Sequence, residues 1–167
     1  MNMLVDVAIN QIRDKINDRD EVGLDDNEIL SYLNEAIQYV SSFLVGAGSP
    51  LVINDLTLTD EETALPKEFV RTAGRFPIRI TGNTIKTLDD PPVTIRYFAN
   101  TKRVELDDDM PFSQLALNQV CIKLAAIYCQ NQEALDVSQD KALLNEINQA
   151  IAVAVNGPVT AANQPQG

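Results

Sequence analysis

The sequence predicts an α+β protein, mainly helical, in which four helices form the core and an antiparallel β-rich insertion separates the second helix from the third. Apolar residues recur at helical spacing towards both ends of the chain, and they alternate with polar residues between about 51 and 100. Clusters of Gly and Pro separate the two patterns. We expect one domain over residues 1–155 and a flexible, uncharged, extended tail over residues 156–167.

Two helices are expected before the insertion. Within residues 3–18, apolar residues fall at the i, i+3, i+4 and i+7 positions, which predicts a short amphipathic helix. The second helix is expected to begin near Asp25 or Asp26, because Asp25 and Glu28 have the spacing of a capping pair at a helix N-terminus. Its apolar stripe continues to Leu44, after which Gly and Pro residues end it.

The β-rich insertion is expected over about residues 51–100. Within it, Gly82 and Asn83 separate two short alternating segments and predict a two-residue hairpin turn, because both residue types tolerate positive φ. Residues 93–99 are rich in β-branched and aromatic side chains and predict a further strand. The acidic residues 60–62 are interpreted as a turn between strands.

Two further helices are expected after the insertion. Pro111 is a favoured residue for a first helical turn, and Asp109 just before it is interpreted as the N-cap. One apolar face then runs as far as Tyr128. The last helix is expected to begin with Ser138 as N-cap and to end where Asn156 is followed by Gly and Pro.

Composition and charge limit the possible functions. The chain has 13 basic and 24 acidic residues and a formal net charge of -11, which argues against tight binding to nucleic acid phosphates. It has no His and no Trp, so the commonest general base and metal ligand is missing. No run reaches the roughly 18 apolar residues of a membrane span, and the N-terminus lacks the basic region of a signal peptide. We therefore expect the newly made protein to be cytosolic.

The two cysteines are expected to be buried free thiols. Cys121 and Cys129 lie eight residues apart on one predicted helix. That spacing corresponds to about 12 Å along the helix axis, which is beyond the reach of a disulfide.

The basic residues are unevenly distributed. Residues 67–103 contain eight basic and three acidic residues and so have a net positive charge. The rest of the chain is therefore more negative than the chain as a whole. One interpretation is that complementary charges fix head-to-tail contacts between copies. The other is that Lys and Arg solvate the outer face of a sheet and protect its edges.

Several acidic clusters could suggest chemistry. Glu105, Asp107, Asp108 and Asp109 could suggest a metal site, but the calcium-loop pattern is missing and a solvated acidic loop is the preferred interpretation. A small hydrolase that uses carboxylates such as Glu62 and Asp108 stays open as a less favoured alternative. A binding module for basic peptides also stays open. We expect no catalytic residue, metal or cofactor.

Three segments carry a resemblance to a known family. The segment Asp26–Ala36 resembles the opening of the head-to-tail adaptor (connector) proteins of tailed bacteriophages. Leu65–Phe69 resembles the Leu-Pro step that follows a strand in that family, and Pro92–Phe98 resembles its strand before the third helix. The similarity covers roughly residues 25–155.

The resemblance implies a structural virion protein at the head-tail interface, or neck. Such a protein forms a ring, commonly a dodecamer, beneath the portal, extends the DNA channel without binding DNA specifically, and presents a platform for the next tail or completion protein. The residues expected to bind a partner are Ile151, Val155, Pro158, Val159 and Pro165. The candidate channel-facing acids are Asp107, Asp108 and Asp109. Another tail-completion or tail-tube component stays open as the alternative.

Overall fold

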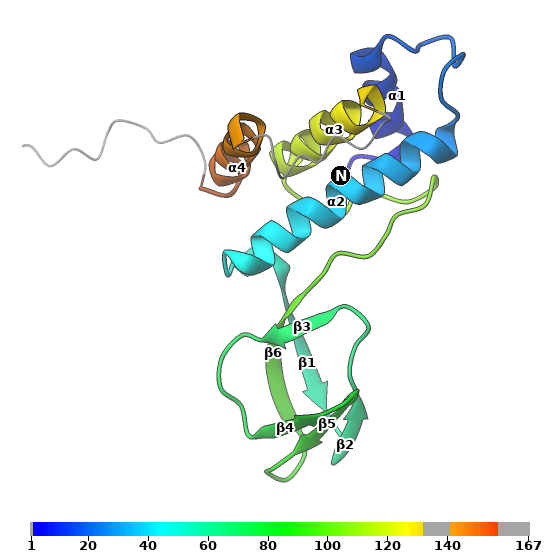
Figure 1. Cartoon of the computed structure of the whole chain (residues 1–167). Coiled ribbons are helices and arrows are strands. Elements are labelled where there is room, and N and C mark those ends of the chain that lie inside the picture. Colours follow the sequence, from blue (N-terminus) through cyan, green and yellow to red (C-terminus); the bar gives the residue numbers. More distant parts are fainter. Residues whose placement is uncertain (1, 132–140, 157–167) are drawn as a thin grey trace, which may run out of the picture. The chain divides into compact units, whose positions relative to one another are not determined.

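The protein has an α+β fold, as its sequence predicts. The computed structural model describes residues 2–131 and 141–156, which contain four α-helices and two small antiparallel sheets of three strands each (Figure 1). Both sheets lie between the second and third helices in the chain. The helices are α1 (Val5–Ile16), α2 (Asp26–Gly46), α3 (Leu115–Gln130) and α4 (Lys141–Asn156). A 3-10 turn, η1 (Pro50–Val52), follows α2.

The chain divides into two compact units. One consists of residues 1–40 and 103–167, and the other of residues 41–102, so the division falls within α2. The second unit contains the predicted insertion. None of the helices in the described residues is both long enough and apolar enough to cross a membrane.

The first unit is built around α3, which packs against α1 on one side and α4 on the other (Figure 1). The amide Nε2 of Gln119 donates a hydrogen bond of 2.9 Å to Oε1 of Gln11 across the α1–α3 contact. Lys123 and Glu146 form an ion pair across the α3–α4 contact. The largest fully buried side chains of this unit are Ile12, Ile29, Leu33, Ile37, Met110, Leu117, Ile122 and Leu124.

The predicted start of α2 is confirmed. The backbone N–H of Asp25 donates to Oε2 of Glu28 at 2.8 Å, and the backbone N–H of Glu28 donates to Oδ1 of Asp25 at 2.8 Å. This reciprocal pair satisfies two N–H groups that have no partner within the helix, which explains why α2 begins at Asp26.

The second unit contains the two sheets. The first has the order β1-β6-β3, with β1 (Ile53–Leu58), β6 (Val93–Ala99) and β3 (Phe69–Thr72). The second has the order β2-β5-β4, with β2 (Glu62–Ala64), β5 (Thr84–Thr87) and β4 (Ile78–Thr81). A buried cluster joins side chains from both sheets: Leu58, Ile85, Val93 and Ile95.

The predicted hairpin and strand are both confirmed. Thr81 pairs with Thr84 across the Gly82-Asn83 turn, and β6 has the predicted bounds. Gly82 has a φ of 57°, whereas Asn83 is not among the residues with positive φ. Only the first central residue therefore needs the left-handed region, which is the pattern of a type II′ turn.

The predicted start of α3 is wrong. We expected Pro111 in the first turn with Asp109 as N-cap, but the helix begins at Leu115 and its N-cap residue is Gln114. Asp109 instead pairs with Leu4 in an isolated antiparallel bridge. This bridge holds the backbone of Asp109 extended, so Asp109 does not cap a helix that begins at Pro111.

The last helix is described from Lys141 onwards, so the expected N-cap Ser138 lies outside the described residues. Within α4, Ile147 and Ile151 of the predicted stripe are buried. Apart from Asn156, the predicted tail also lies outside the described residues.

Candidate functional site

The acidic loop that contains the candidate channel-facing residues is tied to the start of α1 in the first unit. The backbone N–H of Val5 donates to the carbonyl oxygen of Asp108 at 2.9 Å. The backbone N–H of Met110 donates to the carbonyl oxygen of Met3 at 2.7 Å. With the bridge between Leu4 and Asp109, these bonds fix the path of the loop while leaving its carboxylates in solvent.

The structure places Asp107, Asp108 and Asp109 together on this exposed loop. Asp107 also lines a small pocket of about 140 Å³ with Leu4, Asp6 and Leu106. The Oδ2 of Asp108 accepts a hydrogen bond of 2.8 Å from the backbone N–H of Glu105, which closes the turn. The loop therefore presents a small, strongly negative surface with a fixed backbone.

Two asparagines that the sequence analysis did not select hold the ends of this loop. Asn34 on α2 is only 3% exposed. Its Nδ2 donates to the carbonyl oxygen of Val104 at 3.0 Å, and its Oδ1 accepts from the N–H of Val104 at 2.8 Å. Asn118 on α3 does the same with Phe112, through bonds of 2.7 Å and 3.3 Å. We call Asn34 and Asn118 the asparagine clamps.

A signal for the clamps is present in the sequence. Leu30, Asn34, Ile37 and Ser41 have the spacing of one helical face, so Asn34 and Ser41 are polar residues on an otherwise apolar stripe. A buried polar side chain needs a hydrogen-bond partner, and an irregular chain segment supplies one. In the second unit Ser41 follows the same rule, because its Oγ accepts a 2.9 Å bond from the N–H of Thr101.

The residues expected to bind a partner fall into three groups. Ile151 is 1% exposed, so its side chain lies within the packed structure. Val155, near the end of α4, is partly exposed. Pro158, Val159 and Pro165 lie outside the described residues.

The loop between α1 and α2 in the first unit is organised by Asp18, which accepts backbone hydrogen bonds from Val22, Gly23 and Leu24 at 3.0–3.1 Å. Arg13, which is buried, donates to Asp18 at 3.1 Å and to the carbonyl oxygen of Leu24 at 2.9 Å. The bonds from Gly23 and Leu24 are the main cause of a lowered pKa for Asp18, and the charge of Arg13 adds to it. We call residues 18–24 the acidic knob.

The pKa of Arg13 is also shifted. Burial alone would lower it, but the hydrogen bond to Asp26 and the nearby carboxylates raise it above its ordinary value. The guanidinium therefore stays charged and holds the acidic knob against the start of α2.

At the tip of the acidic knob, Val22 is 86% exposed, the largest exposure among the large apolar side chains that the structure describes. Asp20 and Glu21, which precede it, are also exposed. Glu21 has a φ of 56°, a left-handed conformation that is uncommon for a residue with a side chain. The tip of the acidic knob thus places one exposed apolar side chain beside two carboxylates.

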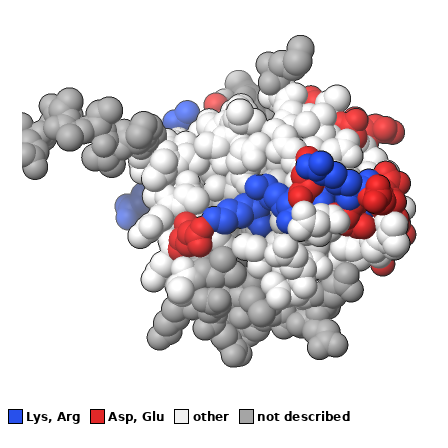
Figure 2. Space-filling model, turned by 90° about the horizontal axis from the view of Figure 1, so that it is seen from above, with Lys and Arg blue, Asp and Glu red and all other residues white. Residues whose placement is uncertain are grey.

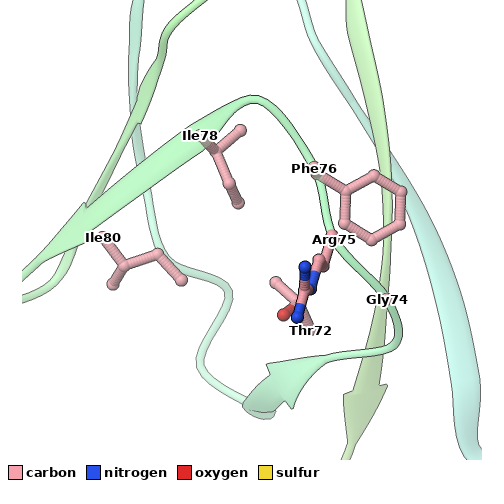
Figure 3. A pocket seen from close by; sticks show the side chains of 6 residues that line it. All are labelled: Thr72, Gly74, Arg75, Phe76, Ile78 and Ile80. Carbon is pink, nitrogen blue, oxygen red and sulfur yellow. The ribbon is translucent and has the colours of Figure 1, made fainter.

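The second unit carries an open apolar pocket of about 410 Å³ (Figure 3). It is lined by Thr72, Gly74, Arg75, Phe76, Ile78 and Ile80. Figure 3 shows Ile78 and Ile80 projecting from the same side of β4. We call this the Arg75 pocket. It combines an apolar surface with one cation, which suits an apolar group that carries a negative charge nearby.

The acidic residues 60–62 of the β-rich insertion and the two cysteines are placed differently: the acidic residues are exposed and the cysteines are buried. Asp60, Glu61 and Glu62 are exposed, and Glu62 pairs with Lys86 across the sheet at 3.7 Å. Cys121 and Cys129 are buried and free, as expected, and burial raises their pKa values to about 12 and about 11. In the described part of the chain, no three of the residue types His, Cys, Asp and Glu are grouped so that they could hold a metal ion.

The two units differ in net charge. The second unit contains seven basic and seven acidic residues, so the net negative charge belongs to the first unit. On the face shown in Figure 2, basic side chains lie directly beside acidic ones at the left and at the right, and uncharged residues cover most of the remainder. That face is therefore of mixed sign.

The described residues form a small α+β protein with three prominent surface features: an acidic loop fixed by backbone hydrogen bonds, the acidic knob and the Arg75 pocket. No protein-family model matches the chain, and no curated protein matches it.

Proposed function

We propose that this protein is a head-to-tail adaptor of a tailed bacteriophage. It is then a structural protein of the virion neck that forms a ring beneath the portal, extends the DNA channel and joins the capsid to the tail. The observation that carries the proposal is the order of elements, in which an insertion of two small antiparallel sheets separates two pairs of helices. The segments that resemble the adaptor family all fall within this order.

The segments that carry the resemblance occupy consistent places in this order. Asp26–Ala36 forms the first half of α2. Leu65–Phe69 connects β2 to β3, and Pro92–Phe98 leads into β6 and forms most of it. Each motif alone is short and has little specificity. The proposal is supported because all three motifs lie in the helix or strand, or beside the strand, that the resemblance assigns to them.

The charge of the first unit suits a protein that lines or borders a DNA channel. A surface rich in carboxylates repels the phosphate backbone, so DNA can pass without being retained. The exposed Asp107, Asp108 and Asp109 are the candidates for this role, because their loop is fixed by backbone hydrogen bonds.

The adaptor acts by binding alone and needs no cofactor. Its partners are other copies of the chain in the ring, the portal protein, and the next tail or completion protein. Double-stranded DNA passes through without specific binding. The protein is made in the host cytoplasm before it joins the virion.

The test is electron microscopy of the purified protein mixed with the portal protein from the same genome, beside each component alone. A collar of added density with the symmetry of the portal is the expected result. Portal rings beside unassociated copies would overturn the proposal, and tubes or rings formed without the portal would favour another tail component.

Matched variants separate docking from DNA passage. Replacing Asp107, Asp108 and Asp109 by Asn should leave the collar intact and slow DNA ejection from assembled particles, since fewer charges repel the backbone. The matched control replaces the exposed Asp89 and Asp90 by Asn. Equal ejection rates in both variants would remove the role of the acidic loop. A deletion of residues 157–167 tests separately whether the chain end is needed for docking.

A further inference from the structure

The Arg75 pocket lies where the two sheets of the second unit expose their edges. β3 is the edge strand of one sheet and β4 is the edge strand of the other, and the segment that joins them lines the pocket. Phe76 and Ile78 are half-buried because they also pack against the core cluster, whereas Ile80 is 40% exposed. The apolar floor is therefore fixed by the core and open to a partner.

Arg75 has no ion-pair partner among the described residues. Arg71, the preceding basic residue of this unit, already has partners within the unit. Its guanidinium donates to the carbonyl oxygen of Val45 at 3.1 Å and lies over the ring of Phe98. An occupant of the pocket should thus bring both an apolar side chain and a carboxylate.

The acidic knob has the complementary chemistry. Val22 offers an apolar side chain that is 86% exposed, and Glu21 beside it offers a carboxylate. Because Asp18 and Arg13 already hold the knob in one conformation, docking costs little conformational entropy.

We propose that the acidic knob of one copy of this chain docks in the Arg75 pocket of another copy. Val22 contacts Phe76, Ile78 and Ile80, and Glu21 pairs with Arg75. The contact is made by side chains and not by strand addition, because the N–H groups of Val22 and the two residues after it are already bound to Asp18.

Such a contact is heterologous: each copy uses the knob towards one neighbour and the pocket towards the other. Repetition of a heterologous contact gives a closed ring when the rotation closes and a filament when it does not. The inference rests on the proposed function in one respect, since it supplies the copy-to-copy contact of the proposed ring.

Disulfide trapping between separate copies tests the contact directly. Full-length V22C and I80C proteins are mixed, and the mixed dimer is measured under mild oxidation. The native Cys121 and Cys129 are buried and should not interfere. The matched control pairs V22C with L88C, because Leu88 is exposed in the same unit, at 58%, but does not line the pocket. The V22C–I80C dimer should form about tenfold faster than the control dimer, since docking raises the local concentration of the thiols.

Charge variants provide a second, independent readout. R75E and E21R should each slow the trapping of V22C with I80C, and E21R in the V22C chain combined with R75E in the I80C chain should restore it. R79E is the matched control, because Arg79 alternates with Ile78 and Ile80 along β4 and so projects from the opposite face of the sheet. Its trapping rate should not change.

The outcomes separate this inference from the proposed function. A collar on the portal without preferential trapping overturns the knob-and-pocket contact and leaves the adaptor role standing. Preferential trapping without a collar supports the contact and overturns the adaptor role. Equal trapping rates for I80C and L88C, whether or not a ring forms, overturn the contact.

Discussion

The asparagine clamp at Asn34 leads to a quantitative prediction. In Asn34→Ala, the N–H and the carbonyl oxygen of Val104, a residue that is itself buried, lose their partners. Each buried backbone group without a hydrogen bond costs about 1–3 kcal/mol. The better helix propensity of Ala returns about 0.6 kcal/mol. We expect the free energy of unfolding to fall by about 3 kcal/mol.

The assay is equilibrium unfolding in urea, followed by circular dichroism and by hydrogen exchange at the amide of Val104. That amide should exchange faster in the variant. The slope of the unfolding free energy against urea concentration should not change. The matched control is Asn10→Ala, an exposed position on α1, which should lose no stability and should gain about 0.6 kcal/mol from helix propensity alone. A loss below about 1 kcal/mol with unchanged exchange at Val104 would refute the reasoning, since it would mean that other partners satisfy these backbone groups.

Three further predictions concern charge, thiols and core packing. The pKa of Asp18 is lowered in the folded protein, so its contribution to stability is present above its ordinary pKa of about 4 and is lost as the pH falls below that value. Thermal denaturation should show a steeper loss of stability below about pH 4 in the unchanged protein than in Asp18→Asn, and parallel curves would contradict this. Because burial raises the pKa values of Cys121 and Cys129, both thiols should react with a thiol reagent at pH 8 only after unfolding, and rapid labelling of the folded protein would show that the cysteines are accessible. Leu58→Ala removes a fully buried side chain from the core cluster of the sheets and should cost about 2–5 kcal/mol in urea unfolding. The exposed Leu88→Ala is its control and should change stability by less than about 0.5 kcal/mol, so similar losses in both would contradict the assigned core.

The features that the sequence predicts well are those with local causes. The capping pair of Asp25 and Glu28 needs only residues three apart, and the Gly82-Asn83 turn needs only a residue that accepts positive φ. The apolar periodicity of the helices is likewise a local property. These elements are confirmed because no distant contact competes with them.

The features that the sequence does not predict depend on distant partners. The start of α3 is displaced because Asp109 pairs with Leu4, more than a hundred residues earlier. The division of the insertion into two sheets depends on β1 pairing with β6 across most of the second unit. The Arg75 pocket also needs tertiary structure, since it forms only where two edge strands meet.

At Val104 and Phe112 the asparagine clamps bind backbone atoms and not side chains, and every residue with a backbone N–H offers the same two groups. Apart from the Asp108 carboxylate, which closes the turn at Glu105, and the buried Met110, the side chains between the clamps therefore have little part in setting the path of the loop. During evolution, the charge pattern of that loop can change while its position is kept, whereas a change at either asparagine removes the support. This separation lets a binding surface adapt to a new partner on an unaltered scaffold.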